Sequence, residues 1–122
     1  MLAPHTAERT LLIVDDDNPF RNSLARAMER RGFRVATADS VSAGIAAAHD
    51  QRPGYAVLDL RLGDGSGLEI VPQIREVSPD ARIIMLTGYG NIATAVAAVK
   101  AGAIDYLPKP ADADQVEAAL KI

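Results

Sequence analysis

The sequence predicts an α/β domain built on a single doubly wound parallel sheet of five strands in the order 2-1-3-4-5, with five helices. Strand and helix signals alternate five times along the 122 residues, which is typical of linked strand–helix–strand units. The expected strands are short, nearly continuous apolar runs, the pattern of strands that helices cover on both faces. Because crossovers between parallel strands are right-handed, the carboxyl ends of all the strands should meet at one edge.

The strand signals are apolar runs bounded by turn-forming residues. They are expected at residues 11–14, 34–38, 55–60, 82–86 and 104–107. The helix signals between them are apolar residues at helical spacing or alanine-rich stretches. They are expected at residues 19–31, 41–51, 68–77, 92–101 and from 113 to at least 120.

Capping residues mark several helix ends. Asn18, Ser40 and Asn91 precede the first, second and fourth helices and are expected to cap them, with Pro19 as the first helical residue. Glycines then stop the first and fourth helices. The third helix follows a glycine-rich loop at residues 63–67, and Pro72 should loosen its first turns because proline lacks a backbone donor.

Composition indicates one ordinary globular domain over residues 10–122, preceded by a flexible arm at residues 1–9. Hydrophobic residues make up 48% and charged residues 24% of the chain. No apolar run is long enough to span a bilayer and no signal peptide is evident, so a cytoplasmic location without membrane contact is expected. The absence of cysteine excludes thiol chemistry, and two distant histidines do not suggest zinc. A net charge of −3 disfavours nucleic-acid binding by this segment.

Acidic side chains follow two strands that should be neighbours in the sheet. Asp15 and Asp16 come directly after the first strand, and Asp59 lies near the end of the third. Each acid alone is more often a solvated turn residue, but carboxylates that face one another repel and demand a cation. Mg²⁺ prefers oxygen ligands and accepts few carboxylates, so these three aspartates, with the main-chain oxygen of Arg61, form the expected metal site.

Two further strand ends carry groups suited to phosphate. Thr87 ends the fourth strand and Lys109 follows the fifth, where a hydroxyl can donate to a phosphoryl oxygen and an ammonium can neutralise another. Asp59 is at the centre of the predicted sheet, and a carboxylate can attack phosphorus to form an acyl phosphate. The sequence therefore predicts Asp59 as a phosphoacceptor assisted by Mg²⁺, Lys109 and Thr87.

The same motifs resemble a response-regulator receiver domain, which has the flavodoxin-like fold. The resemblance rests on LLIVDDD, YAVLDLRLGDGSGLE, IIMLTGYG and AVKAGAIDYLPKP. It implies that Asp59 takes phosphate from the phosphohistidine of a sensor histidine kinase in a Mg²⁺-dependent reaction that the domain itself catalyses without being a classical enzyme. It also implies that Thr87 and Tyr106 couple the phosphate to the surface of the fourth helix, fifth strand and fifth helix, and that the Lys109–Pro110 peptide is cis.

A narrower resemblance is to the RegA/PrrA/ActR group of redox-responsive bacterial regulators. It is carried by residues 88–100 together with Asp59-Leu60-Arg61-Leu62. The group implies control of transcription through a C-terminal DNA-binding domain that is absent from this chain, so DNA contact is expected only through that domain. Ile92, Ala93, Val96 and Val99 offer an apolar patch at which a second copy could pair, unless some of them are core.

Two other functions fit part of the pattern. A haloacid-dehalogenase-like phosphatase would use Asp15 as its nucleophile with Asp17, Thr87 and Lys109, but Pro19 departs from that motif and Asp59 would have no role. A phosphorylation-independent interaction module would keep the fold without the chemistry, although the complete acidic set argues against it.

Overall fold

The computed structural model describes residues 9–88, 92–103 and 105–121, and in them one five-stranded parallel sheet has the order β2-β1-β3-β6-β7. The sheet strands are β1 (Thr10–Val14), β2 (Arg34–Ala38), β3 (Tyr55–Asp59), β6 (Arg82–Thr87) and β7 (Asp105–Pro108). The predicted topology is confirmed. Most of the expected arm, the Asn91 cap and Ile104 lie outside the described residues.

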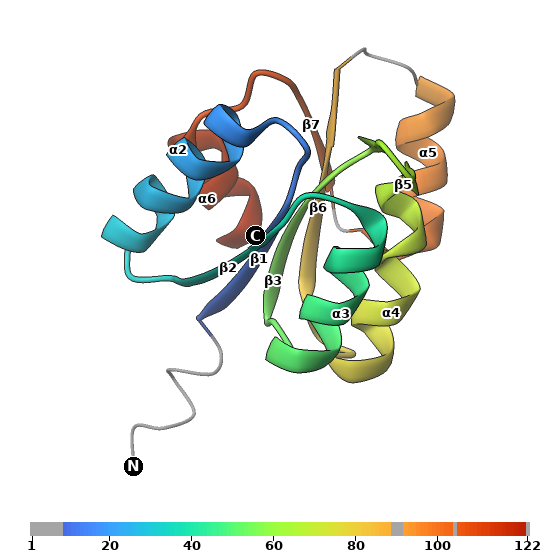
Figure 1. Cartoon of the computed structure of the whole chain (residues 1–122). Helices are drawn as coiled ribbons and strands as arrows, with labels where there is room; N and C mark the ends of the chain where they lie inside the picture. Colours follow the sequence, from blue (N-terminus) through green and yellow to red (C-terminus); the bar gives the residue numbers. More distant parts are fainter. Residues whose placement is uncertain (1–8, 89–91, 104, 122) are drawn as a thin grey trace.

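Helices cover both faces of the sheet (Figure 1). They are α2 (Asn18–Arg30), α3 (Val41–Gln51), α4 (Val71–Val77), α5 (Ile92–Ala101) and α6 (Ala113–Lys121). In Figure 1, α2 and α6 lie on one face, and α3, α4 and α5 lie on the other. None of the helices in the described ranges is long and apolar enough to cross a membrane.

Alternating side chains of the strands fill two hydrophobic cores. On β1, Leu11 and Ile13 pack toward α2 and α6, whereas Leu12 and Val14 pack toward α3 and α4. The same alternation continues along β3 and β6, whose apolar side chains are fully buried. Burial on both faces fixes the register of each strand, since a slip of one residue would exchange the two cores.

The cap of α2 differs from the predicted one. Asp17, and not Asn18, has the extended backbone that a cap requires (φ −83°, ψ 100°), and its carboxylate accepts a hydrogen bond from the Phe20 N–H at 3.1 Å. Asn18 is the first helical residue. The prediction for Ser40 is confirmed, because its hydroxyl accepts a hydrogen bond from the Ala43 N–H at 3.0 Å.

The segment after β3 is more ordered than the loop predicted from its glycines. It forms a small antiparallel hairpin of β4 (Arg61–Leu62) and β5 (Gly65–Ser66), followed by a 3₁₀ turn, η1 (Gly67–Glu69). Ser66 and Glu69 close this turn with a reciprocal capping box. The helix therefore begins later than predicted, at Val71, and Pro72 falls in its first turn, where a missing N–H costs little.

The two neighbouring capping candidates before α2 can be separated by mutation. We expect Asp17→Ala to lower the free energy of unfolding by about 1 kcal/mol, because the Phe20 N–H loses its acceptor. Asn18→Ala is the matched control and should change it by less than about 0.5 kcal/mol. Urea unfolding of the metal-free protein measures both values. A larger loss for Asn18→Ala than for Asp17→Ala would contradict the assignment.

Candidate functional site

The carboxyl ends of four neighbouring strands bring the predicted polar residues to one edge of the sheet, the upper edge in Figure 1. Asp15 and Asp16 follow β1, Asp59 ends β3 and Thr87 ends β6. Lys109 follows β7, and its backbone N–H donates to the Thr87 carbonyl at 2.7 Å. The side chains meet because these strands are parallel, so that their carboxyl ends lie at the same edge. Open α/β sheets bind their ligands at this edge.

Carboxylates from β1 and β3 crowd together at this edge. Asp15, Asp16 and Asp59 each offer an oxygen, and these oxygens all lie within 4.8 Å of one another. Asp15 and Asp59 are buried, whereas Asp16 is exposed. Three like charges this close, two of them out of water, repel strongly unless a cation lies between them.

Lys109 supplies part of that positive charge. Its Nζ lies 2.9 Å from Asp15 Oδ2 and 3.2 Å from Asp59 Oδ2. The bond to Asp59 is a well-formed hydrogen bond, while the contact with Asp15 is an ion pair without hydrogen-bond geometry. Within the described part of the chain, Asp15 Oδ2 is the one fully buried side-chain oxygen or nitrogen without a hydrogen bond. A single ammonium therefore leaves the pocket short of positive charge.

The backbone around Asp15 holds this carboxylate in place. Asp15 Oδ1 accepts a hydrogen bond from the Asp17 N–H at 2.9 Å, and the Asp15 carbonyl accepts one from Arg21 Nη1 at 2.8 Å. The Asp15 N–H donates to the Ala38 carbonyl at the end of β2. One bond thus holds the carboxylate itself, and two hold the Asp15 backbone that carries it.

Burial and repulsion act on the protons of the site. Burial, followed by the negative charge of Asp15, raises the pKa of Asp59, although Lys109 and the Arg61 N–H oppose the shift. Burial by itself would lower the pKa of Lys109, but its close contacts with the negative charges of Asp15 and Asp59 outweigh it and raise that pKa. The lysine stays charged, and Asp59 is less acidic than an exposed aspartate.

The donor set fits a hard divalent cation. Three carboxylates from two adjacent strands provide oxygen ligands, and Asp15 Oδ2, which is ion-paired with Lys109 but accepts no hydrogen bond, is an atom that an added cation would also pair. The backbone N–H of Arg61 acts to lower the pKa of Asp59, which is consistent with an Arg61 peptide beside the site. Its carbonyl as a ligand remains a prediction.

Thr87 and Tyr106 lie at different depths. Thr87 is buried at the end of β6, whereas Tyr106 is opposite Met85 in the β6–β7 register and its residue surface is 40% exposed. The coupling of Thr87 to Tyr106 remains a prediction. The Lys109–Pro110 peptide is cis, which confirms the expectation from the resemblance.

Sequence reasoning missed a close contact behind the phosphoacceptor candidate. A Cβ added at Gly67 would overlap the carbonyl oxygen of Asp59 and would lie 3.2 Å from Met85 Cε. Glycine is therefore required where the chain returns beneath β3. The cluster of three glycines at residues 63–67 signalled a loop, but nothing in it distinguished this position from Gly63, which has open space around it.

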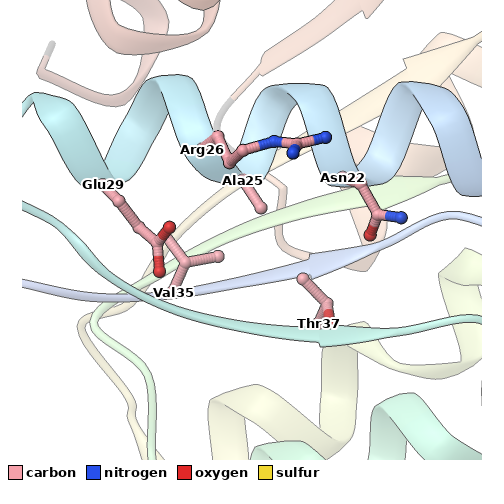
Figure 2. A pocket seen from close by; sticks show the side chains of 6 residues that line it. All are labelled: Asn22, Ala25, Arg26, Glu29, Val35 and Thr37. Atoms are coloured by element: carbon pink, nitrogen blue, oxygen red, sulfur yellow. The ribbon is translucent and has the colours of Figure 1, made fainter.

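A shallow groove of about 350 Å³ lies between α2 and the edge strand β2 (Figure 2). Figure 2 shows Asn22, Ala25, Arg26, Glu29, Val35 and Thr37 along its walls. None of these residues belongs to the acidic cluster, so the groove is not part of the candidate metal site.

Comparison with known proteins gives the same picture. Residues 11–121 match the response regulator receiver domain family. The photosynthetic apparatus regulatory protein RegA of Rhodobacter capsulatus is 61% identical over 93% of this chain and 62% of that protein. The acid tolerance regulatory protein ActR of Sinorhizobium medicae is 63% identical over 93% of this chain and 58% of that protein. The chain thus spans about three-fifths of these relatives' length.

Solved structures share the fold. A response regulator from Burkholderia pseudomallei, determined with a phosphorylated aspartic acid, calcium ion and citrate, has a TM-score of 0.87 at 43% identity, covering 92% of this chain and 66% of that chain. The beryllofluoride-activated receiver domain dimer of NtrC4 has a TM-score of 0.81 at 31% identity, covering 93% of this chain and 97% of that chain. The resemblance predicted from the motifs, including that to RegA and ActR, is confirmed.

Two glycines of the same loop give a matched test of the contact behind Asp59. We expect Gly67→Ala to lower the free energy of unfolding by about 1–3 kcal/mol, the usual cost of overpacking, because the new methyl displaces the Asp59 backbone. Gly63→Ala should change it by less than about 0.5 kcal/mol. Urea unfolding measures both. Equal effects would show that the close approach at residue 67 is not required.

Proposed function

This chain belongs to the response regulator receiver domain family, and we propose that it accepts a phosphoryl group on Asp59 from the phosphohistidine of a sensor histidine kinase. The observation that carries the proposal is the position of Asp59: buried, central in the sheet, hydrogen-bonded to Lys109 and beside two further carboxylates. Asp15 is fully buried against Lys109 and is less accessible to an incoming phosphorus atom.

In the proposed reaction, an Asp59 carboxylate oxygen attacks phosphorus, and the O–P bond forms as the N–P bond breaks. The electron pair of the broken bond remains on the imidazole nitrogen of the kinase. Lys109 stays charged and neutralises a phosphoryl oxygen, and the Thr87 hydroxyl donates to another. Asp15, Asp16, Asp59 and the Arg61 carbonyl would hold Mg²⁺, which supplies charge neutralisation for the transferred group. The chain thereby catalyses its own phosphorylation. In the dephosphorylation that it would also catalyse, water attacks phosphorus, the bond from Asp59 to phosphorus breaks, and the Asp59 carboxylate and inorganic phosphate are released.

The output would leave through the surface formed by α5, β7 and α6. A phosphoryl group adds nearly two negative charges beside the buried Thr87, and movement of Thr87 toward it would let the Tyr106 ring turn inward. Val96, Val99 and Tyr106 are 46%, 52% and 40% exposed on this surface, so the two valines are not core. The beryllofluoride-activated NtrC4 receiver is a dimer, which supports pairing of activated copies, and the exposed valines make this surface our candidate for the contact.

The regulated process would lie in the rest of a longer protein. RegA and ActR are regulatory proteins of which this chain covers 62% and 58%, and control of transcription through a DNA-binding domain would belong to a part of such a protein that this chain does not cover. We place the phosphotransfer in the cytoplasm, because a regulator of transcription would have access there both to the kinase and to the target DNA.

Phosphoryl transfer from a small donor tests the acceptor directly. Incubation with Mg²⁺ and acetyl phosphate should add one phosphoryl group to nearly all wild-type molecules, measured as intact-protein mass. Asp59→Asn should add none, because the amide is not nucleophilic. Chelation of the metal should abolish the gain, because the charges of the acidic site are then uncompensated.

The other functions predict different masses. A gain that survives in Asp59→Asn would move the nucleophile elsewhere, with Asp15 the first suspect, as in the phosphatase alternative. No gain in the wild type would leave a phosphorylation-independent module.

The exposed valines of α5 provide a test of pairing. Phosphorylated wild type should sediment as a dimer at concentrations where the free form is a monomer, and Val99→Asp should remain monomeric because a charge would be buried in the interface. Thr37→Asp is the control, because Thr37 is on β2, which is at the opposite edge of the sheet from β7. Equal sedimentation of free and phosphorylated wild type would count against phosphorylation-dependent pairing.

A further inference from the structure

The turn of the hairpin after β3 reaches across to the start of another helix. Asp64 is at this turn, and its carboxylate accepts two backbone hydrogen bonds from α3. The Val41 N–H donates to Oδ1 at 2.8 Å, and the Ser42 N–H donates to Oδ2 at 3.1 Å. These two bonds lower the pKa of Asp64 and so favour its carboxylate form.

The contact completes the N-terminus of α3. A helix begins with four N–H groups that lack partners within the helix. Here the Ser40 hydroxyl accepts from the Ala43 N–H. Asp64 accepts from the N–H groups of Val41 and Ser42, so that the first three helical residues are all satisfied, and it places a negative charge at the positive end of the helix dipole.

The same hairpin contains the predicted main-chain metal ligand. Arg61 begins β4 and pairs with Ser66, and its backbone N–H helps to lower the pKa of the Asp59 carboxyl two residues before it. The hairpin is only two residue pairs long, which is marginal without outside support. The hairpin is held at one end by its connection to β3 and at its turn by the hydrogen bond from the Val41 N–H of α3 to Asp64.

We propose that Asp64 is a positioning residue for the metal site. Its carboxylate braces the hairpin against α3, and this brace holds the Arg61 peptide beside Asp59. The brace does not touch the metal or the phosphoryl group. Its consequence for metal affinity rests on the proposed function, because it requires the Arg61 carbonyl to be a ligand.

A purely structural role would make a different prediction, and Ser40 separates the two. Ser40→Ala removes a cap from the same helix but leaves the hairpin untouched. Asp64→Ala removes two capping bonds and also frees the hairpin. If Asp64 only stabilised α3, both variants would affect the site in proportion to their loss of stability.

The first measurement is Mg²⁺ affinity by isothermal titration calorimetry on the folded protein. We expect Asp64→Ala to raise the Kd by about tenfold, the lower end of the loss when an outer partner of a ligand is removed. Ser40→Ala should leave it unchanged. Asp39→Asn controls for charge, because it removes one exposed carboxylate beside the same helix start without breaking the brace.

The second measurement needs no metal. Hydrogen exchange of the β4–β5 amides in the metal-free protein should be faster in Asp64→Ala than in wild type, and unchanged in Ser40→Ala. This readout separates failure of the brace from failure of the proposed function. Fast exchange without any Mg²⁺ binding by wild type would keep the brace and reject the metal site.

Two results would overturn the proposal. One is unchanged exchange and unchanged Mg²⁺ affinity in Asp64→Ala. The other is an equal loss of affinity in Asp64→Ala and either control, which would assign the effect to helix stability or to net charge. A selective loss in Asp64→Ala supports it.

Discussion

The structure depends on holding mutually repelling carboxylates at one edge of a parallel sheet. Asp15, Asp16 and Asp59 offer oxygens within 4.8 Å of one another, and Lys109 compensates only part of their charge. Burial of two of the acids makes the repulsion larger, because little water screens it. This excess of negative charge destabilises the metal-free fold and favours binding of a divalent cation. A phosphoryl group brings further negative charge, so the site can accept it only together with the cation and Lys109.

The rest of the fold opposes that repulsion. The strands that end at the site are packed on both faces by two apolar cores, so that they cannot spread apart without exposing buried side chains. Local features then fix the individual groups. Arg21 donates a hydrogen bond to the Asp15 carbonyl. At Gly67 the absence of a side chain allows the chain to approach the Asp59 carbonyl closely. Arg31 links α2 to Glu117 of α6 at 2.8 Å, which ties together the two helices on one face.

Sequence patterns predicted the strand ends and the residues that gather there, because these follow from apolar runs and their terminations, whereas the sheet order came with the flavodoxin-like fold. They failed where a choice depends on backbone angles or on distant partners. Asp17 and Asn18 are both good caps, and only the extended backbone of Asp17 decides between them. The two-residue strands of the hairpin are too short to show periodicity. Asp64 and Val41 are separated by 23 residues, so no local pattern relates them.

The two sides of the site differ in how firmly they are held, and this difference suits a switch. On the side of β1 and β3, Asp15 is hydrogen-bonded to the Asp17 N–H and to the Arg21 side chain of α2. The hairpin is attached to α3 through Asp64. On the side of β7, Tyr106 and the valines of α5 expose apolar surface that has not been buried within the chain. A local charge change can produce a directed movement only if one side stays fixed while the other has an alternative packing. The proposed phosphorylation would therefore act against a rigid metal side and be expressed on the α5–β7 surface, where a second copy offers the apolar contacts that the monomer lacks.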